Sequence, residues 1–196
     1  MRVQLPPPAF LESGYRWALT TAAIVRLFRS RDRSALMRLI AGLHRHPAHR
    51  ARGIWTYGTP RDVLAALLRQ RGLRLLVAER DGRIVGYLAG KFERRLRGQP
   101  RRVGHIMETF VATELRRQGV GLALVENFLE WLRRKKAEDI KVGYVLGNRS
   151  AGSFWTGLGF RPYVVTANAR PADVRARASS QRRLRARASP RPTRPS

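Results

Sequence analysis

Apolar residues recur at helical and strand spacing between residues 24 and 166, and this pattern divides the chain into short elements. An apolar run at residues 24–28 predicts a strand. A helix is predicted after residues 30–34, because apolar positions recur there at i, i+3, i+4 and i+7, namely Leu36, Leu39, Ile40 and Leu43. Thr59-Pro60 can begin a second helix, with threonine as the cap and proline at the first helical position, which would bury Val63, Leu64, Leu67 and Leu68.

The remaining pattern predicts a hairpin followed by alternating strands and helices. Two β-prone runs, residues 73–79 and 83–90, flank Arg80-Asp81-Gly82, and the Asp-Gly pair is a strong signal for a tight turn. Residues 91–102 form a basic loop or a ragged strand end. Further strands are expected at residues 103–112, 140–146 and 160–166, with helices at 119–134 and 150–157. The longer helix presents an apolar stripe made of Leu122, Val125, Phe128, Leu129 and Leu132.

Length and composition predict one folded domain with an extension at each end. The 196 residues suit one well-cored domain, and 43% hydrophobic residues is an ordinary globular content. Residues 1–22 contain a proline run and have no sustained period, which indicates either an N-terminal extension of unknown function or translation from an overlong start. Residues 23–168 are expected to form the domain. Residues 169–196 hold nine arginines against one acid and predict a basic, disordered tail.

The net charge of +27 raises the question of a polyanionic partner, because clustered arginines attract phosphate. Only four of the 40 basic residues are lysine, a ratio that arginine-favouring codon usage also produces, and the arginines are scattered along the chain. Nucleic acid is therefore a partner that the sequence allows but does not favour. The chain has no cysteine, which indicates a reducing cytoplasm and excludes a cysteine nucleophile. No apolar run is long enough to span a membrane.

The most informative local feature is a strand that passes through a basic turn into an amphipathic helix at residues 111–122. Gly119 and Gly121 have no Cβ, so a ligand can approach the backbone where the helix begins. The first amides of a helix have no intrahelical acceptor and the dipole is positive there. Arg116 and Arg117 add mobile positive charge at the rim. The turn suits a phosphate group, although it has neither the Walker pattern nor the glycine spacing of dinucleotide folds.

This turn resembles the first signature of the GNAT superfamily of N-acetyltransferases, Arg/Gln-x-x-Gly-x-Gly/Ala, which is matched by Arg116, Gly119 and Gly121. A second family signature, Asn-x-x-Ala-x-x-Phe-Tyr-x-x-x-Gly-Phe, is matched in register by Asn148, Ala151, Phe154, Gly159 and Phe160. The hairpin also looks like the family's second and third strands. The resemblance implies an α/β (α+β) fold: a mixed, mostly antiparallel sheet of six to seven strands with flanking helices and a V-shaped splay between strands four and five.

The same resemblance implies acetyl-CoA as co-substrate and a set of residues that bind it. Pantetheine would lie in the splay like an added strand and bond to the backbone of Phe110 and Val111, and the Val111 amide would polarise the thioester carbonyl. Asn148 and Trp155 would contact the cofactor from the second signature. The pyrophosphate would be held by the turn, with Arg116 and Arg117 at its rim and the amides of Gln118, Gly119, Val120, Gly121 and Leu122.

Acetylation of an amine needs a proton acceptor and an oxyanion stabiliser. Glu108 lies in an apolar run just before the cofactor region, where burial would raise its pKa toward that of a useful base, unless the position is an exposed one. His105 is the second candidate base. Strand alternation places it on the opposite face from Glu108 unless a bulge intervenes.

Trp155 stands where many members of the family carry the tyrosine that protonates the departing thiolate. An indole N–H is too weakly acidic for that task. Tyr144, expected on the fifth strand, is a substitute acid, and water can also serve.

Three histidines, His44, His46 and His49, suggest a metal cluster. Pro47 breaks the helix that would align them, and no acidic ligand lies close in sequence. We therefore expect a solvated loop and no metal.

Together these patterns predict an N-acetyltransferase that moves acetyl from acetyl-CoA to a primary amine by direct attack. The acceptor is a small molecule, a peptide N-terminus or a lysine, and a homodimer is left open. The alternative is a binding protein on the same fold, with weak or no catalysis. It would engage RNA, ribosome or an acidic protein through the loop at residues 94–102 and the arginine-rich tail.

Overall fold

The computed structural model describes residues 23–47, 58–94, 102–165, 167 and 169–188, with side chains of the last helix described as far as residue 183. The chain divides into two compact units, Met1–Gly152 and Ser153–Ser196. Each unit is described by itself below.

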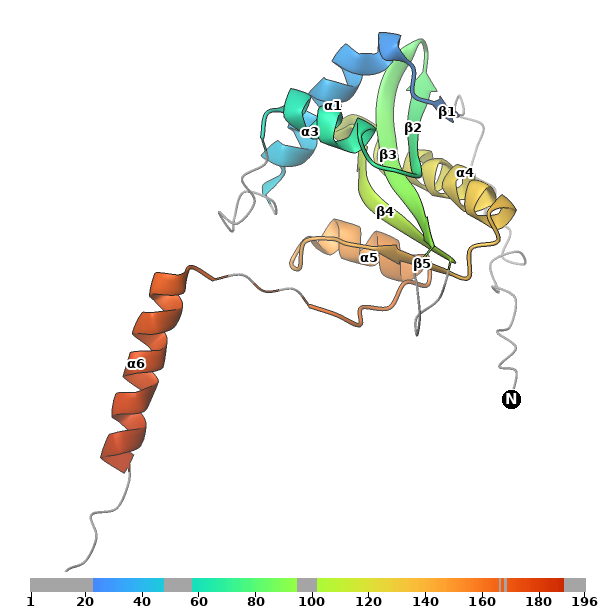
Figure 1. Ribbon diagram of the computed structural model, residues 1–196. Coiled ribbons are helices and arrows are strands. Elements are labelled where there is room, and N and C mark those ends of the chain that lie inside the picture. The colour runs from blue at the N-terminus through green and yellow to red at the C-terminus, as the bar shows by residue number, and fades with distance from the viewer. Residues whose placement is uncertain (1–22, 48–57, 95–101, 166, 168, 189–196) are drawn as a thin grey trace, which may run out of the picture. The chain divides into compact units, whose positions relative to one another are not determined.

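The first unit holds a five-stranded sheet in the order β1-β2-β3-β4-β5 (Figure 1). All neighbouring strands pair antiparallel except β4 and β5, which are parallel. The elements of the first unit are β1 (Ile24–Leu27), the 3-10 helix η1 (Ser30–Asp32), α1 (Arg33–Arg45), α3 (Pro60–Leu68), β2 (Leu73–Arg80), β3 (Arg83–Arg94), β4 (Arg102–Val111), η2 (Thr113–Leu115), α4 (Val120–Arg134) and β5 (Asp139–Val142), and α5 (Arg149–Gly157) begins in it.

Helices cover both faces of this sheet. On one face α1 and α3 bury an apolar cluster against β2 and β3, which includes Ile40, Leu64, Val77 and Tyr87. On the other face α4 packs so closely that glycine is needed beneath it, because a Cβ at Gly90 would overlap the Phe128 ring. A layer of apolar side chains therefore lies on each face of the sheet, between the strands and the helices that cover them.

The predicted hairpin between β2 and β3 is confirmed. Asp81 and Gly82 have φ of 50° and 71°, so both central residues of the turn are left-handed. This is the two-residue turn whose twist matches that of the flanking strands. β3 continues through Arg94, so the basic stretch that follows the hairpin begins as a strand rather than a loop; residues 95–101 lie outside the described residues.

The predicted start of the second helix, α3, is also confirmed. Thr59 is its cap and Pro60 its first residue. The Asp62 amide donates to Thr59 Oγ1 at 3.3 Å, and the Thr59 amide donates to Asp62 Oδ2 at 2.9 Å. This reciprocal pair satisfies two backbone donors that the helix leaves without partners.

A buried ion pair fixes the entry of the chain into the domain. Arg26 on β1 donates to both carboxylate oxygens of Asp32, at 2.7 and 2.9 Å, and to Glu79 on β2 at 2.7 Å. Asp32 is 4% exposed, and the hydrogen bond from Arg26 is the main cause that lowers its pKa. The network holds β1, η1 and β2 together. Removing one partner of such an ion pair is strongly destabilising, because the other charge stays buried without a counterion.

Two details of α4 and β5 differ from the predictions. Leu129 does not belong to the buried stripe of α4, because it is 42% exposed, whereas Leu124, one turn earlier, is fully buried. Strand β5 ends at Val142 instead of continuing to residue 146; among the described residues it pairs with β4 alone, over Val103–Ile106.

The second unit contains the end of α5 and the helix α6 (Pro171–Ala188). The expected final strand at residues 160–166 is not found over 160–165, where Tyr163, Val164 and Val165 are 82%, 68% and 72% exposed. Apolar β-branched residues form a strand only where a partner strand receives them. The sheet described here therefore has five strands rather than six or seven.

The arginine-rich segment was expected to be disordered, and the structure describes a helix there instead. The segment is rich in alanine and arginine, both of which have high helix propensity, and Pro171 occupies the first position. The side chains at residues 171–183 are exposed. No helix in the described part of the chain is both long and apolar enough to cross a membrane.

Candidate functional site

Strand β4 has an edge that is only half paired. β5 lies beside Val103–Ile106, with Val103 opposite Asp139 and Ile106 opposite Val142. Beyond Val142 the chain leaves the sheet, so within the described residues no strand pairs with residues 107–111 on that side. Such an edge offers unpaired amide and carbonyl groups to an extended ligand. This is the predicted splay between the fourth and fifth strands (Figure 1).

Backbone pairing separates the roles of Phe110 and Val111. The Ala112 amide donates to the Val85 carbonyl at 2.9 Å, so the backbone groups of Ala112 face β3. Because peptide groups alternate sides along a strand, those of Phe110 also face β3 and those of Val111 face the open edge. The Phe110 carbonyl indeed lies 3.1 Å from the Cβ position of Gly86 on β3. The geometry fits the predicted backbone role of Val111 and does not favour that of Phe110.

The basic turn after β4 leads into α4 through two left-handed residues. Arg117 and Gly119 have φ of 59° and 81°, and Gly119 is the N-cap of α4. No atom lies within 4 Å of a Cβ placed on Gly119, so the space above this backbone is open. The amides of Val120, Gly121 and Leu122 form the first turn of the helix and have no intrahelical acceptor. The backbone at the start of α4 is therefore open, and its role as a phosphate cradle stays a prediction.

Side chains hold this turn in place. The Gln118 side chain accepts from Arg80 at 2.7 Å and donates to the Glu114 carbonyl at 3.0 Å, which ties the turn to the β2–β3 hairpin. Arg116 donates to the Val111 carbonyl at 3.2 Å and lies over the Phe110 ring at 5.3 Å. Arg116 is thus placed at the open edge of β4 and not only at the rim of the turn.

Glu108 lies on β4 just before that edge, and its carboxylate accepts from the Tyr87 hydroxyl at 2.9 Å. Burial raises the pKa of Glu108, and the hydrogen bond from Tyr87 opposes that rise. A half-buried carboxylate with a raised pKa, held by one neutral donor, is a candidate general base. The alternative of an exposed strand position is wrong.

A bulge in β4 changes the relation between Glu108 and His105. Ala89 of β3 pairs with Glu108 and the next residue, Gly90, pairs with Ile106, so Met107 is an extra residue in β4. The bulge shifts the alternation by one position. His105, which pairs with Lys91, therefore lies on the same face of the sheet as Glu108, not on the opposite one.

Tyr144 and Asn148 follow β5. Tyr144 lies two residues beyond the strand end rather than on the strand, and its ring is 3.6 Å from the Cβ position of Gly152. Asn148 caps α5, since its Oδ1 accepts from the Ala151 amide at 3.1 Å. The motif asparagine thus has a structural task in the first unit, in addition to the cofactor contact that remains a prediction.

Trp155, in the second unit, is 2% exposed and lies between two other rings. Its ring centroid is 4.8 Å from that of Phe154 and 5.3 Å from that of Phe160, both in edge-to-face geometry. Within its unit Trp155 is a packing residue, and its contact with the cofactor stays a prediction.

The histidines of α1 do not form a metal centre in the part of the chain that the structure describes. His44 and His46 lie at the end of α1, where burial lowers the pKa of both rings, and the charge of Arg116 lowers that of His46 further. His49 lies outside the described residues. No group of three potential ligands among the described side chains could hold a metal ion.

Comparison with known proteins identifies the family. The model of the acetyltransferase (GNAT) family matches residues 42–160 of the chain. The chain belongs to this family. As a GNAT protein it is an N-acetyltransferase that uses an acyl-CoA donor. A comparison with curated proteins found no match.

Solved structures share the GNAT fold at low sequence identity. A tetramutant of the BH1408 protein from Bacillus halodurans is 19% identical, with a TM-score of 0.67 over 75% of this chain and 99% of that one. The aminoglycoside acetyltransferase meta-AAC0020 from an uncultured soil metagenomic sample is 19% identical, with a TM-score of 0.59 over 76% and 95%. The ribosomal-protein-alanine N-acetyltransferase from Brucella melitensis biovar Abortus 2308 is 17% identical, with a TM-score of 0.61 over 76% and 99%. These neighbours establish the fold and leave the acceptor open.

Two features of this GNAT site could not be recognised from the sequence. Tyr87, the partner of Glu108, reads in the sequence as one more aromatic residue of a strand, and only the register of β3 on β4 reveals it. The second is the unpaired backbone of Thr109, which faces the open edge together with Val111 by strand alternation. The hairpin signal places Tyr87 on β3, but the bulge at Met107 decides which residue it meets.

Proposed function

We propose that the protein transfers acetyl from acetyl-CoA to a primary amine, with Glu108 as the general base. The residues present fit such a donor in two ways. The open edge at Val111 can pair with pantetheine as a strand would, and the left-handed Gly119 leaves space for a phosphate group at the first amides of α4. Bound there, acetyl-CoA supplies an activated acetyl group as a thioester.

The side chains around this edge divide the chemistry. Glu108 accepts a proton from the attacking ammonium or amine, and Tyr87 keeps the carboxylate oriented. The Val111 amide, which points to the open edge, stabilises the oxyanion of the tetrahedral intermediate. Trp155 cannot protonate the departing thiolate, so Tyr144 or water has this role. Arg116 would exchange its present acceptor, the Val111 carbonyl, for a phosphate oxygen.

One observation supports this proposal most strongly: Glu108 is a half-buried carboxylate with a raised pKa, on the strand whose edge is open to the donor. We would measure thiol release from acetyl-CoA over a panel of small amines, peptides and lysine-containing peptides. Glu108→Gln keeps the size of the side chain and an oxygen for Tyr87, and loses the base. General-base catalysis contributes about a hundredfold to ten-thousandfold in rate, and we expect a loss in that range. Unchanged turnover in Glu108→Gln would remove this residue from the mechanism.

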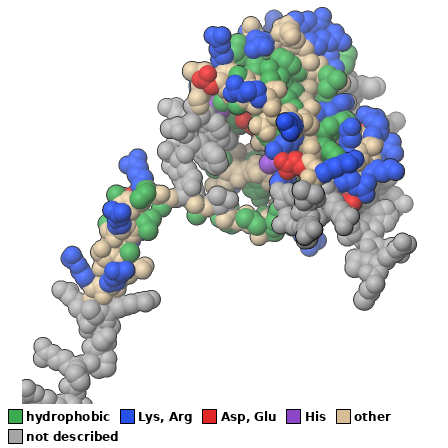
Figure 2. Space-filling view, viewed as in Figure 1, with side chains coloured by type: hydrophobic (Ala, Val, Ile, Leu, Met, Phe, Trp, Pro, Cys, Tyr) green, Lys and Arg blue, Asp and Glu red, His purple; other side chains and the backbone are tan. Residues whose placement is uncertain are grey.

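A second candidate function rests on α6. This helix carries exposed arginines, among them Arg177, Arg182 and Arg183, and no apolar stripe. Figure 2 shows basic side chains along it. A polar helix of this length is marginal in water by itself, so binding to a polyanion such as RNA would stabilise it.

Binding to an RNA duplex at several salt concentrations tests this second function. Changing Arg177, Arg182 and Arg183 together to Gln in the full chain should weaken binding and reduce its salt dependence, while thiol release is unaffected. Gly119→Glu is the converse control and should leave RNA affinity unchanged. Equal RNA affinity in the triple variant would exclude α6 as the binding segment.

A further inference from the structure

Three basic side chains, two lysines and a histidine, lie in one row across the sheet, on the same face as Glu108. Lys91 on β3 pairs with His105 on β4, and His105 pairs with Lys141 on β5. Residues directly opposite each other on paired strands point to the same face. We call Lys91, His105 and Lys141 the cationic row.

The row lies a short step from the proposed base. Glu108 pairs with Ala89, which is two residues from Lys91 along β3. Two residues of strand correspond to about 7 Å, since a strand rises about 3.4 Å per residue. The bulge at Met107 is what brings the row and Glu108 to one face. A molecule of the size of an amino acid or a dipeptide can therefore contact both.

The two lysines of the row are not equally paired, and the acids Glu93 and Asp139 lie on the same face as the row. Glu93 is placed between the two lysines: Lys91 Nζ lies 2.6 Å from one of its oxygens, and Lys141 Nζ lies 3.9 Å from the other. The second distance is at the outer limit of an ion pair, so Lys141 gains little from Glu93. The side chains of Lys91 and Lys141 are 20% and 23% exposed, which leaves them open to a ligand but partly shielded from water.

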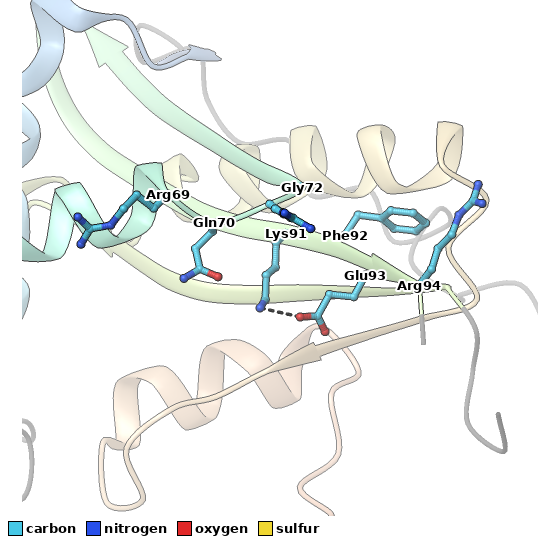
Figure 3. A pocket seen from close by; sticks show the side chains of 8 residues that line it. Arg69, Gln70, Gly72, Lys91, Phe92, Glu93 and Arg94 are labelled. Carbon is cyan, nitrogen blue, oxygen red and sulfur yellow. Dashed lines mark ion pairs between the residues drawn. The ribbon is translucent and has the colours of Figure 1, made fainter. Parts of the chain in front are cut away.

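A groove of about 730 Å³ continues from the row past the end of α3. Four of its eight lining residues are cationic and one, Glu93, is acidic. Figure 3 shows Lys91 and Glu93 pointing to the same side of β3, with Gln70 beside them. Arg69 and Arg71 at the end of α3 are exposed and add charge at the rim. The groove thus favours an anion over a neutral group along its length.

We propose that the acceptor is an amine that also carries a carboxylate. The carboxylate binds Lys141 and the cationic row while the amine lies at Glu108. The inference rests on the proposed function and narrows its substrate to acidic amines, such as an ω-amino acid or a peptide whose second residue is acidic. Transfer forms the amide C–N bond and breaks the thioester C–S bond; the amine proton passes to Glu108 and the thiolate is protonated by Tyr144 or water.

The test compares matched acceptors that differ only in charge: ε-aminocaproate with its carboxamide, and a dipeptide ending in Asp with one ending in Asn. Native protein should acetylate the acidic acceptor of each pair with a kcat/KM about tenfold to a hundredfold higher, the range of a hydrogen bond to a charged group. Lys141→Met should remove this preference by raising KM for the acidic acceptors alone. Lys135→Met, at the exposed end of α4, should leave it unchanged. Equal kcat/KM within each pair, or a preference that survives Lys141→Met, would overturn the inference.

Binding of the product separates this inference from the proposed function. The N-acetylated ε-aminocaproate should bind native protein in calorimetry, and Lys141→Met should weaken that binding by about the same tenfold or more. Product binding that depends on Lys141, without any thiol release, would refute the catalytic function and keep the acidic ligand. Thiol release with neutral amines only, and no product binding, would keep catalysis and refute the acidic acceptor.

Discussion

The hydrogen bond from Tyr87 to Glu108 can be removed without changing the shape of the site, by Tyr87→Phe. Tyr87 is fully buried and its hydroxyl lies 2.9 Å from the carboxylate, so water does not readily replace it. A hydrogen bond to a charged group contributes about 1.5–3 kcal/mol, and its loss penalises the ionised form. Since about 1.4 kcal/mol is a factor of ten, the acid dissociation constant of Glu108 should fall by about tenfold to a hundredfold.

The assay is the pH dependence of kcat/KM for thiol release. Burial already raises the pKa of Glu108 and the Tyr87 hydroxyl opposes that rise, so Tyr87→Phe should move the acidic limb of the profile to higher pH. The plateau at high pH should be retained, because the base is still present. An acidic limb at the same pH in native protein and Tyr87→Phe would refute the assignment of Glu108 as the titrating base.

Stability gives an independent control for the same residue. A group whose pKa is raised in the folded state stabilises the fold below its ordinary pKa, and this contribution is lost as pH rises through the raised value. The ionised Glu108 is therefore a cost at neutral pH, and Glu108→Gln should unfold at the same temperature as native protein or higher. An inactive but well-folded Glu108→Gln separates catalysis from folding.

Three further predictions concern the frame that holds the site. Asp32→Asn should lower the free energy of unfolding by about 3 kcal/mol at neutral pH, because it leaves the half-buried Arg26 without its main partner. The pKa of Asp32 is lowered in the fold, so the difference in unfolding free energy between native protein and Asp32→Asn should vanish when denaturation is measured at acid pH. Gly104→Ala should cost about 1–3 kcal/mol in urea unfolding, since its Cβ would meet the Leu132 side chain; no loss would mean that α4 can shift outward. Asn148→Ala should cost about 1 kcal/mol through the lost cap of α5, and Asn148→Asp should restore it.

The sheet and its first helices could be predicted from the sequence where the signals are local. The Asp81-Gly82 turn has one favoured geometry, and Thr59-Pro60 is a helix start whatever surrounds it. Residues 160–165 show the limit of such signals: their β-prone side chains are exposed, because strand formation depends on a partner that local sequence does not specify. In the arginine-rich segment a local signal is sufficient: the high helix propensity of alanine and arginine outweighs the lack of apolar surface, and a helix forms.

The candidate site could be predicted only in part, for a related reason. The glycines of the phosphate turn are readable because a left-handed residue at a helix start demands glycine. The sequence does not predict that His105 and Glu108 lie on the same face of the sheet. The bulge at Met107 that places them there contains neither glycine nor proline, and it depends on how β3 lies against β4. The bulge also brings Glu108 and the cationic row to one face, whereas periodicity alone would place them on opposite faces.

Binding of acetyl-CoA to Gly119→Glu and Gly119→Ala, measured by calorimetry, tests the central claim most directly. Both variants force a side chain onto a residue with φ of 81°, at about the same cost of 1–2 kcal/mol, and nothing within 4 Å obstructs the new Cβ. Only glutamate places a negative charge in the phosphate cradle. We expect Gly119→Ala to bind acetyl-CoA with modest loss and Gly119→Glu to show no binding while remaining folded. An unchanged dissociation constant in Gly119→Glu would contradict the placement of the donor at the start of α4.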